Sequence, residues 1–525
     1  MRSGPPGVGR TGEGRGRLGA RGLRGRGGWL ALAALVVAAW RRMGRDRRWR
    51  VAVLLLVLGF SLLHQLLFAT ATEDAYVSFR YAQNIADGNG PVFNTGDRSE
   101  TYANFLWLVV IALPRGAFGA DVPTAAVGLS CAAALACVLT AYFLANRITA
   151  LGLPEGAEPR RAVGVAAALL TAGANGLAVY GLSGTELPMF ALLVLCVAYA
   201  LVAGRPLVAG VLVAGAVMTR PEGLVLAVVG AGWLVFAAAR GRHTWWAPAG
   251  FVLGALVFLA PWTAWRVTYY DRFGPVPSLP PGPDWPYLGG FALAHLGFLV
   301  PAAVVAGLVA ARRRAVEARS ALWLLLALAV GHTALVLLFE EDPGLSWRLL
   351  APVPPLLAVA AVAGCGVLAP VPSPRAISRA VPAVTAVLTG VAVAVSVFSP
   401  EVLERVRAWS TQGAQLAEVG DWLARYLPPG SVVSAGSPGL LASRAGSQVL
   451  VVGLDAERPT LAVPGRSGYA SRQDCADDLP AWYRVATFRR IGTPFWISVY
   501  PRADEASRLV GELDRAPDFR YVSCP

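Results

Sequence analysis

The sequence predicts a polytopic α-helical membrane protein that carries a soluble α/β domain at its C-terminal end. Of its 525 residues, 55% are hydrophobic and only 15% are charged, whereas soluble globular proteins carry about 25% charged residues. The mean hydropathy is +0.54. Apolar segments of membrane-spanning length recur from residue 51 onward, and the composition becomes that of a soluble protein after about residue 400.

Residues 1–48 are predicted to form a basic tail with one short apolar segment. Residues 1–27 are rich in Gly and Arg and hold almost nothing apolar to bury, so we expect them to be disordered. The apolar run 28–40 is shorter than the roughly 20 residues that a bilayer span needs, which favours an interfacial position. No small-residue cleavage site precedes the next apolar run, which argues against a cleavable signal peptide.

About eleven membrane-spanning helices are predicted between residues 49 and 399, of which one is short. They lie at about 51–71, 122–146, 162–181, 187–204, 206–219, 223–239, 246–266, 287–310, 321–339, 349–370 and 380–398. If residues 41–50 are cytoplasmic, the short Arg-rich loops all fall on the cytoplasmic side, as the positive-inside rule requires. The sequence therefore predicts a multi-pass protein of the inner (plasma) membrane with a cytoplasmic N-terminus.

The apolar run 105–113 must not cross the membrane in this arrangement. Pro114, Arg115 and Gly116 interrupt it after about ten residues, so we expect an interfacial helix. If it crossed, the basic loop 147–161 would lie outside and the charge rule would fail.

Residues 400–525 are predicted to form the extracytoplasmic α/β domain. A helix is expected at 402–426, strands at 431–435, 449–453, 496–500 and 520–523, and a further helix near 504–513. Cys475 and Cys524 lie in this polar region and can pair if it is extracytoplasmic.

The first external loop, 72–121, contains the most informative residues. Thr72 can cap a helix whose first turn holds Glu73 and Asp74, and at helical spacing Glu73, Arg80, Asn84 and Asp87 share one face. Two carboxylates in a first turn also complement the helix dipole without any catalytic role. Their position at the end of the first span, where a base can reach a lipid head group, favours a function.

Several motifs resemble one known family. The acidic pair is followed by Ser-Phe-Arg-Tyr-Ala at 78–82, Val-Phe-Asn-Thr-Gly at 92–96 and Glu-Thr-Tyr-Ala-Asn-Phe-Leu-Trp at 100–107. These runs resemble the actinobacterial terminal β-(1→2)-arabinofuranosyltransferase family, which belongs to the GT-C class of membrane glycosyltransferases and is related to proteins named flagellar motor control proteins. Further similar segments lie at 181–190, 219–223, 342–357 and 420–455, so the resemblance covers about residues 50–460. The loop at 269–277 and the Glu at position 73 depart from the family pattern.

The resemblance implies a GT-C-like fold and a set of site residues. Such an enzyme needs a base for the acceptor hydroxyl and cationic groups for the departing lipid phosphate. Asp74 is the candidate catalytic carboxylate with Glu73 as its partner, and the candidate phosphate ligands are Arg220, Arg348 and Arg80. Candidates for sugar or acceptor binding are Glu186, Glu222, Tyr102 and Asn104. The Arg residues can instead snorkel to head groups, and the Glu residues can simply pair with Arg.

The predicted function is transfer of a sugar, arabinofuranose by the resemblance, from a polyprenyl-phosphate donor to a cell-envelope polysaccharide outside the membrane. Retention and inversion both remain open, no metal constellation or cofactor motif is found, and the need for a divalent cation stays open. The net charge of +14 resides in the tail and the loops, which excludes nucleic-acid binding. The alternatives are a non-catalytic scaffold for envelope or flagellar-motor assembly and a transporter, although the spans hold few polar residues.

Overall fold

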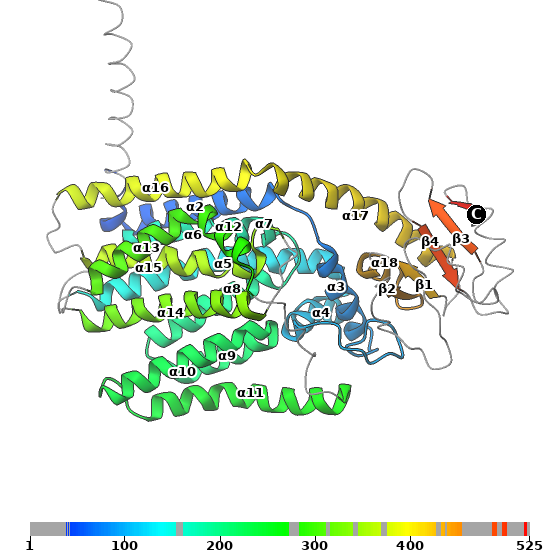
Figure 1. The fold of residues 1–525 in the computed structure, drawn as a ribbon, viewed down its shortest axis with the longest axis horizontal. Coiled ribbons are helices and arrows are strands. Elements are labelled where there is room, and N and C mark those ends of the chain that lie inside the picture. The colour runs from blue at the N-terminus through cyan, green and yellow to red at the C-terminus, as the bar shows by residue number, and fades with distance from the viewer. Residues whose placement is uncertain are drawn as a thin grey trace, which may run out of the picture.

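The computed structural model is a helical bundle with a small sheet at one end (Figure 1). It describes residues 38, 40, 42–153, 161–271, 283–310, 315–339, 345–368, 375–426, 432–435, 438–453, 486–490, 496–500 and 519–521. Residues 1–37 of the basic tail, both cysteines of the possible disulfide and the helix expected near 504–513 lie outside these residues.

Every predicted span contains helix among the described residues. The helices are α2 (Arg47–Leu66), α5 (Val122–Leu151), α6 (Ala162–Ala172), α7 (Asn175–Gly181), α8 (Leu187–Val202), α9 (Pro206–Thr219), α10 (Leu224–Ala239), α11 (Trp246–Tyr270), α12 (Trp285–Ala294), α13 (Leu296–Ala310), α14 (Val316–Phe339), α15 (Val353–Leu368) and α16 (Arg375–Val397). Among the described residues, six helices are long and apolar enough to cross a membrane. The number rises to eight if each of two bent pairs is one span.

The bent pairs explain part of the difference from eleven. Helices α6 and α7 meet at 63° around Gly173 and Ala174, and α12 and α13 meet at 83° at His295. Helices α8 and α9, with 16 and 14 residues, are apolar but shorter than a full span. A hydrophobic run of continuous sequence therefore did not always become a single straight helix.

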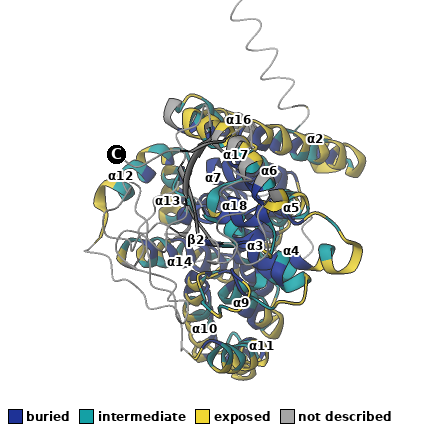
Figure 2. Cartoon of the chain, turned by 90° about the vertical axis from the view of Figure 1, so that its right-hand side faces the viewer, coloured by how far each residue is buried: buried dark blue, intermediate teal, exposed yellow. Residues whose placement is uncertain are grey.

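Apolar side chains cover both the inside and the outside of the bundle. Helix α15 is central, with 89% of its most apolar window buried, whereas the windows of α2 and α11 are only 28% buried. On α2, Leu55, Leu56 and Leu63 are more than half exposed. Figure 2 shows exposed residues along α2, α16 and α11 and buried residues in the centre. Exposed leucine faces of this kind are suited to contact with lipid.

Helices α9 and α11 pack in especially close contact. Gly210 faces the backbone of Phe251 and Ala255, and Gly254 faces the backbone of Leu207. A side chain at either glycine would overlap main-chain atoms of the other helix. Small residues allow membrane helices to approach in this way.

We expect Gly210→Ala to lower the free energy of unfolding by about 1–3 kcal/mol, because the added methyl group must push α11 away. Thermal unfolding in detergent measures the change. Gly250→Ala is the matched control, since the space around Gly250 is open. Equal thermal midpoints for both variants would contradict the close packing.

The first loop forms two helices, α3 (Glu73–Ala86) and α4 (Phe105–Phe118). Helix α4 does not end before Pro114, as the sequence suggested, but continues through it. Proline removes one helical hydrogen bond, and the left-handed Gly119 ends the helix five residues later than expected, with its N–H bonded to the carbonyl of Arg115. At 14 residues α4 remains shorter than a span.

The C-terminal part begins with α17 (Pro400–Tyr426), which leads from the bundle toward the strands (Figure 1). Strands β1 (Val432–Ala435), β2 (Leu450–Gly453), β3 (Ala486–Arg490), β4 (Trp496–Tyr500) and β5 (Phe519–Tyr521) form a sheet in the order β2-β1-β4-β3-β5. Only β1 and β2 are parallel. Helix α18 (Pro438–Ala445), which the sequence analysis missed, packs against both α17 and α3.

Candidate functional site

Four segments meet where the bundle faces α3. They are the first turn of α3, the turn before α8, the 3-10 helix η1 (Pro221–Gly223) and the 3-10 helix η2 (Arg348–Leu350). Each segment contributes one or two of the predicted site residues, because each lies at the end of an apolar helix. The short helices η1 and η2 turn Glu222 and Arg348 away from the regular helical ladder.

Asp74 and Arg348 form an ion pair between Oδ2 and Nη1. The Asp74 side chain is 63% exposed and that of Arg348 is 23% exposed. The pair joins residues 274 positions apart in the sequence. A carboxylate and a guanidinium that are paired but accessible from outside can separate, and each can then bind a group of a substrate.

Arg220 lies between two carboxylates. Its Nη1 donates to Glu186 Oε1 at 2.7 Å, and its Nε and Nη2 donate to Glu222 Oε1 at 2.7 and 2.5 Å. The Glu222 side chain is fully buried, while Glu186 is 12% exposed. One cation thus neutralises one of two negative charges, and the group keeps a formal charge of −1 with Glu186 at its accessible edge.

Asn104 and Ser78 join the two groups. Asn104 Nδ2 donates to Glu186 Oε2 at 3.0 Å and to Ser78 Oγ at 2.9 Å. Ser78 Oγ in turn donates to the carbonyl oxygen of Asp74 at 3.2 Å. Residues from α3, the start of α4 and the start of α8 are therefore held in one connected network.

His332 lies beside the network and was not among the predicted residues. Its ring lies within electrostatic range of Glu222, and its Nε2 lies 2.7 Å from the carbonyl oxygen of Leu349, the neighbour of Arg348. The sequence shows only an isolated histidine in an apolar helix. The only sequence feature that could have indicated a role for His332 is that a polar side chain lies inside an apolar helix.

Glu73 does not join Asp74 in the site, contrary to the prediction. Its carboxylate accepts hydrogen bonds from the backbone N–H groups of Gly439 and, at 3.3 Å, Leu440. Glu73 therefore caps the N-terminus of α18. Gly439 has no room for a side chain, because a methyl group there would press on Val77 and on Glu73 itself. Burial raises the pKa of Glu73 to about 7, although both N–H donors act to lower the pKa.

This pKa predicts a pH dependence of stability. An unfolded glutamate loses its proton near pH 4.5 and the folded one near pH 7, so the folded form is favoured at low pH and that advantage is lost as the pH rises through about 7. The shift corresponds to about 3 kcal/mol. We expect the thermal midpoint of the wild type in detergent, compared with Glu73→Gln, to fall between pH 5 and pH 8. Glu404→Gln on the exposed side of α17 is the control and should show the wild-type profile.

Arg80 is also placed differently from the prediction. Its side chain is 1% exposed and donates to the carbonyl oxygens of Phe93 at 2.8 Å, Ala442 at 3.0 Å and Val449 at 3.0 Å. These bonds occupy all three nitrogen atoms of the guanidinium, Nε, Nη1 and Nη2. The buried guanidinium is therefore unsuited to binding a phosphate. Arg80 instead fastens the first loop to the C-terminal part of the chain.

Tyr102 and Asn104 are more buried than an acceptor-lining role requires. Tyr102 is 7% exposed and its hydroxyl is 2.8 Å from that of Tyr270, while Asn104 is 8% exposed. Both support neighbouring side chains. Among the described residues, no group of three His, Cys, Asp or Glu side chains is arranged to hold a metal ion.

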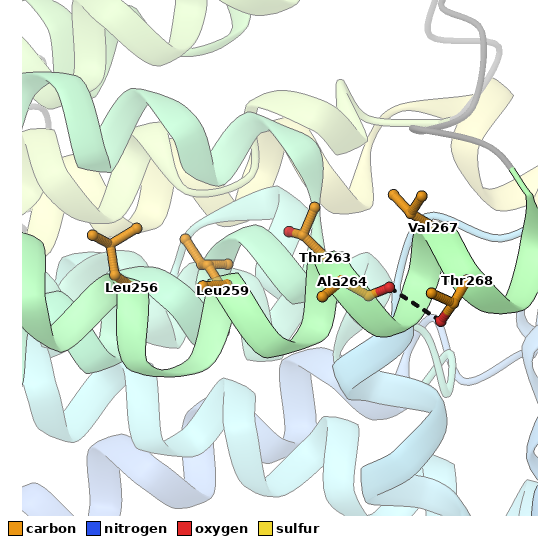
Figure 3. Close-up of a pocket in the computed structure, with 7 residues that line it drawn as sticks. Leu256, Leu259, Thr263, Ala264, Val267 and Thr268 are labelled. Carbon is orange, nitrogen blue, oxygen red and sulfur yellow. Dashed lines mark hydrogen bonds between the residues drawn. The ribbon is translucent and has the colours of Figure 1, made fainter.

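One open face of α11 is mainly apolar. Figure 3 shows Leu256, Leu259, Thr263 and Val267 on this face, on successive turns of the helix. None of the predicted site residues lies on it.

No model of a known protein family matches the chain, and no curated protein matches it by sequence. Solved structures do match. ArnT from Cupriavidus metallidurans in the apo state has a TM-score of 0.55 at 14% identity, covering 77% of this chain and 86% of ArnT. The same protein bound to undecaprenyl phosphate has a TM-score of 0.54 at 15% identity, covering 78% and 86%.

A third similarity is weaker. The arabinosyltransferase EmbB from Mycobacterium smegmatis has a TM-score of 0.40 at 18% identity, covering 64% of this chain and 33% of EmbB, which supports no argument about the sugar. The two ArnT structures show that the chain shares its overall fold with ArnT.

Proposed function

We propose that this chain is a membrane glycosyltransferase that moves a sugar from a polyprenyl-phosphate donor to a cell-envelope glycan. The observation that carries the proposal is the accessible Asp74–Arg348 pair beside the Glu186–Arg220–Glu222 group. The fold shared with ArnT makes such a reaction reasonable but does not assign it. The sugar proposed is arabinofuranose, on the resemblance of the first loop.

In the proposed reaction Asp74 takes the proton of the acceptor hydroxyl. The hydroxyl oxygen bonds to the anomeric carbon, and the bond from that carbon to the phosphate oxygen breaks. Arg348 leaves Asp74 to hold the phosphate and stabilises its developing charge. Arg220, already shared by two carboxylates, is better suited to orient Glu186 toward sugar hydroxyls than to attract an anion.

The two ends of the bundle differ in charge in a way that supports an external site. Glu186 lies at the start of α8 and Arg205 follows its end, about 24 Å away at 1.5 Å per residue. Arg147 on α5, Arg240 after α10 and Arg319 on α14 likewise lie far from the site along their helices. By the positive-inside rule we expect this basic end to be cytoplasmic, which supports an external position for the site and the C-terminal part.

The open apolar face of α11 suits contact with the chain of a polyprenyl carrier. It presents apolar groups and two Thr side chains, and it extends to Thr268, close to the end of α11 that contacts the first loop. A lipid tail along this face would keep its phosphate near the level of the site.

The test is transfer from radiolabelled decaprenyl-phosphoarabinose in membranes that express the wild type, compared with membranes that lack it. New labelled glycan only in the first set supports the proposal. Activity with another polyprenyl-phosphate sugar would retain the reaction class and overturn the arabinofuranosyl assignment. Failure with every such donor, in membranes that contain the folded protein, would contradict the enzyme and favour the scaffold.

A further inference from the structure

Aromatic side chains gather where the first loop meets the end of α11. Phe105, Trp262, Trp265 and Tyr269 are each partly exposed, and we name these four the aromatic surface. The ring centroids of Phe105 and Trp265 are 5.1 Å apart, and those of Phe105 and Trp262 are 6.0 Å apart. Trp265 and Tyr269 stack at 5.3 Å and 25°. Two helices distant in the sequence thus contribute to one surface.

Three buried tyrosines, Tyr81, Tyr102 and Tyr270, pack behind the aromatic surface and hold it in place. Tyr102 contacts Phe105, and its hydroxyl is bonded to that of Tyr270, which donates to the carbonyl oxygen of Pro91 at 2.8 Å. Tyr81 packs edge-on against Tyr102 at 4.9 Å. The rings are therefore held rigidly before any partner arrives, which lowers the entropy cost of binding.

Charged groups border the aromatic surface. Arg266 Nε donates to Glu100 Oε1 at 2.6 Å, and the guanidinium of Arg266 lies 5.3 Å from the ring centre of Trp262. The exposed Arg98 lies 4.9 Å from the ring centre of Tyr269. Trp262 Nε1 is buried with no hydrogen-bond partner among the described residues. The surface therefore combines flat apolar faces with the exposed guanidinium of Arg98 and, at its border, the largely buried Arg266–Glu100 ion pair.

We infer that the aromatic surface binds the acceptor glycan next to the proposed site. A sugar ring offers an apolar C–H face and an edge of hydroxyl groups, which complement an aromatic face bordered by charged groups. The surface is continuous with the site, because Phe105 follows Asn104, whose amide is bonded to Glu186. The inference rests on the proposed function, since it names the substrate that this function requires.

Tryptophan and tyrosine also form belts at membrane surfaces, and this explanation predicts a different orientation. Trp262, Trp265 and Tyr269 repeat at helical spacing on one side of α11, and their rings face Phe105 and Tyr270. At 3.6 residues per turn, the open apolar face lies on the opposite side of the helix. The aromatic surface therefore faces the first loop, whereas a belt would face lipid.

The test measures acceptor binding and transfer with the purified full chain in detergent. The probes are an α-(1→5)-linked arabinofuranosyl hexasaccharide, mannohexaose and cellohexaose. Binding is measured without donor by isothermal titration calorimetry, and transfer is measured at saturating donor. We expect Trp265→Ala to raise the Kd and KM for one of these glycans about fivefold, with kcat and the donor KM unchanged, as for the loss of one aromatic contact. Trp246→Ala is the matched control, an exposed tryptophan at the other end of α11, and should leave all four constants unchanged.

Binding of none of the three glycans by the wild type, or equal Kd values for wild type and Trp265→Ala, would overturn the inference. Glycan binding that Trp265→Ala weakens, with no transfer from any donor, would overturn the enzyme proposal and leave the glycan-binding surface standing. Equal losses of thermal stability in Trp265→Ala and Trp246→Ala, with binding unchanged, would identify a membrane belt and overturn the inference.

Discussion

Asp74→Asn should lower the rate of sugar transfer at least about 100-fold, because a positioned general base contributes this much or more. The asparagine keeps the size of the side chain but cannot accept the proton. The Asp74 side chain is 63% exposed, so its charge contributes little to stability and the variant should fold normally. Single-turnover transfer at saturating donor and acceptor measures the effect on the chemical step.

Asp87→Asn is the matched control on the same helix. Asp87 is paired with Arg115 at 2.8 Å, at the other end of α3. The Asp87→Asn variant should retain the wild-type rate of transfer. Similar rates in Asp74→Asn and the wild type would remove Asp74 from the mechanism, whatever the substrate proves to be.

Arg220→Gln should be the most destabilising of the single substitutions considered. It leaves the fully buried carboxylate of Glu222 without its cation, and breaking a buried pair in this way costs about 3–5 kcal/mol. The change is measured as the free energy of unfolding in mixed micelles. Adding Glu222→Gln should restore much of the loss, because the fully buried charge is then gone and the charge left without its cation, on Glu186, is 12% exposed.

Arg348→Gln separates stability from activity. Its partner Asp74 is exposed, so the expected loss of stability is about 0–1 kcal/mol, while transfer should fall strongly because the phosphate loses its ligand. Equal losses of stability in Arg220→Gln and Arg348→Gln would contradict the expectation that the more buried ion pair contributes more to the free energy of unfolding.

The sequence predicted most of the helices because a bilayer demands long apolar runs, and the polar residues at their ends stand out. That is why Asp74, Glu186, Arg220, Glu222 and Arg348 were all singled out and now lie in one region. Breaks inside an apolar run, as at Gly173 and His295, leave no comparable signal in composition.

Two candidate residues were misjudged for a common reason. Glu73 and Arg80 lie in the same conspicuous motif as Asp74, but they bond to main-chain groups of the C-terminal part. Every residue has a backbone N–H or carbonyl group, so a sequence motif cannot identify which of them will bond to Glu73 or Arg80. His332 was missed for the opposite reason, since nothing in its own helix indicates the carboxylate it approaches.

The contacts of Glu73, Arg80 and Asn94 with residues 439–451 span 357 to 369 positions. During synthesis the first loop therefore emerges long before its partners exist, and contacts of such sequence separation form late. Helix α3, which carries Asp74, can therefore complete these contacts only after residues 439–451 have been synthesised. A partly synthesised chain therefore lacks the contacts that hold α3, and with it Asp74, in the final position.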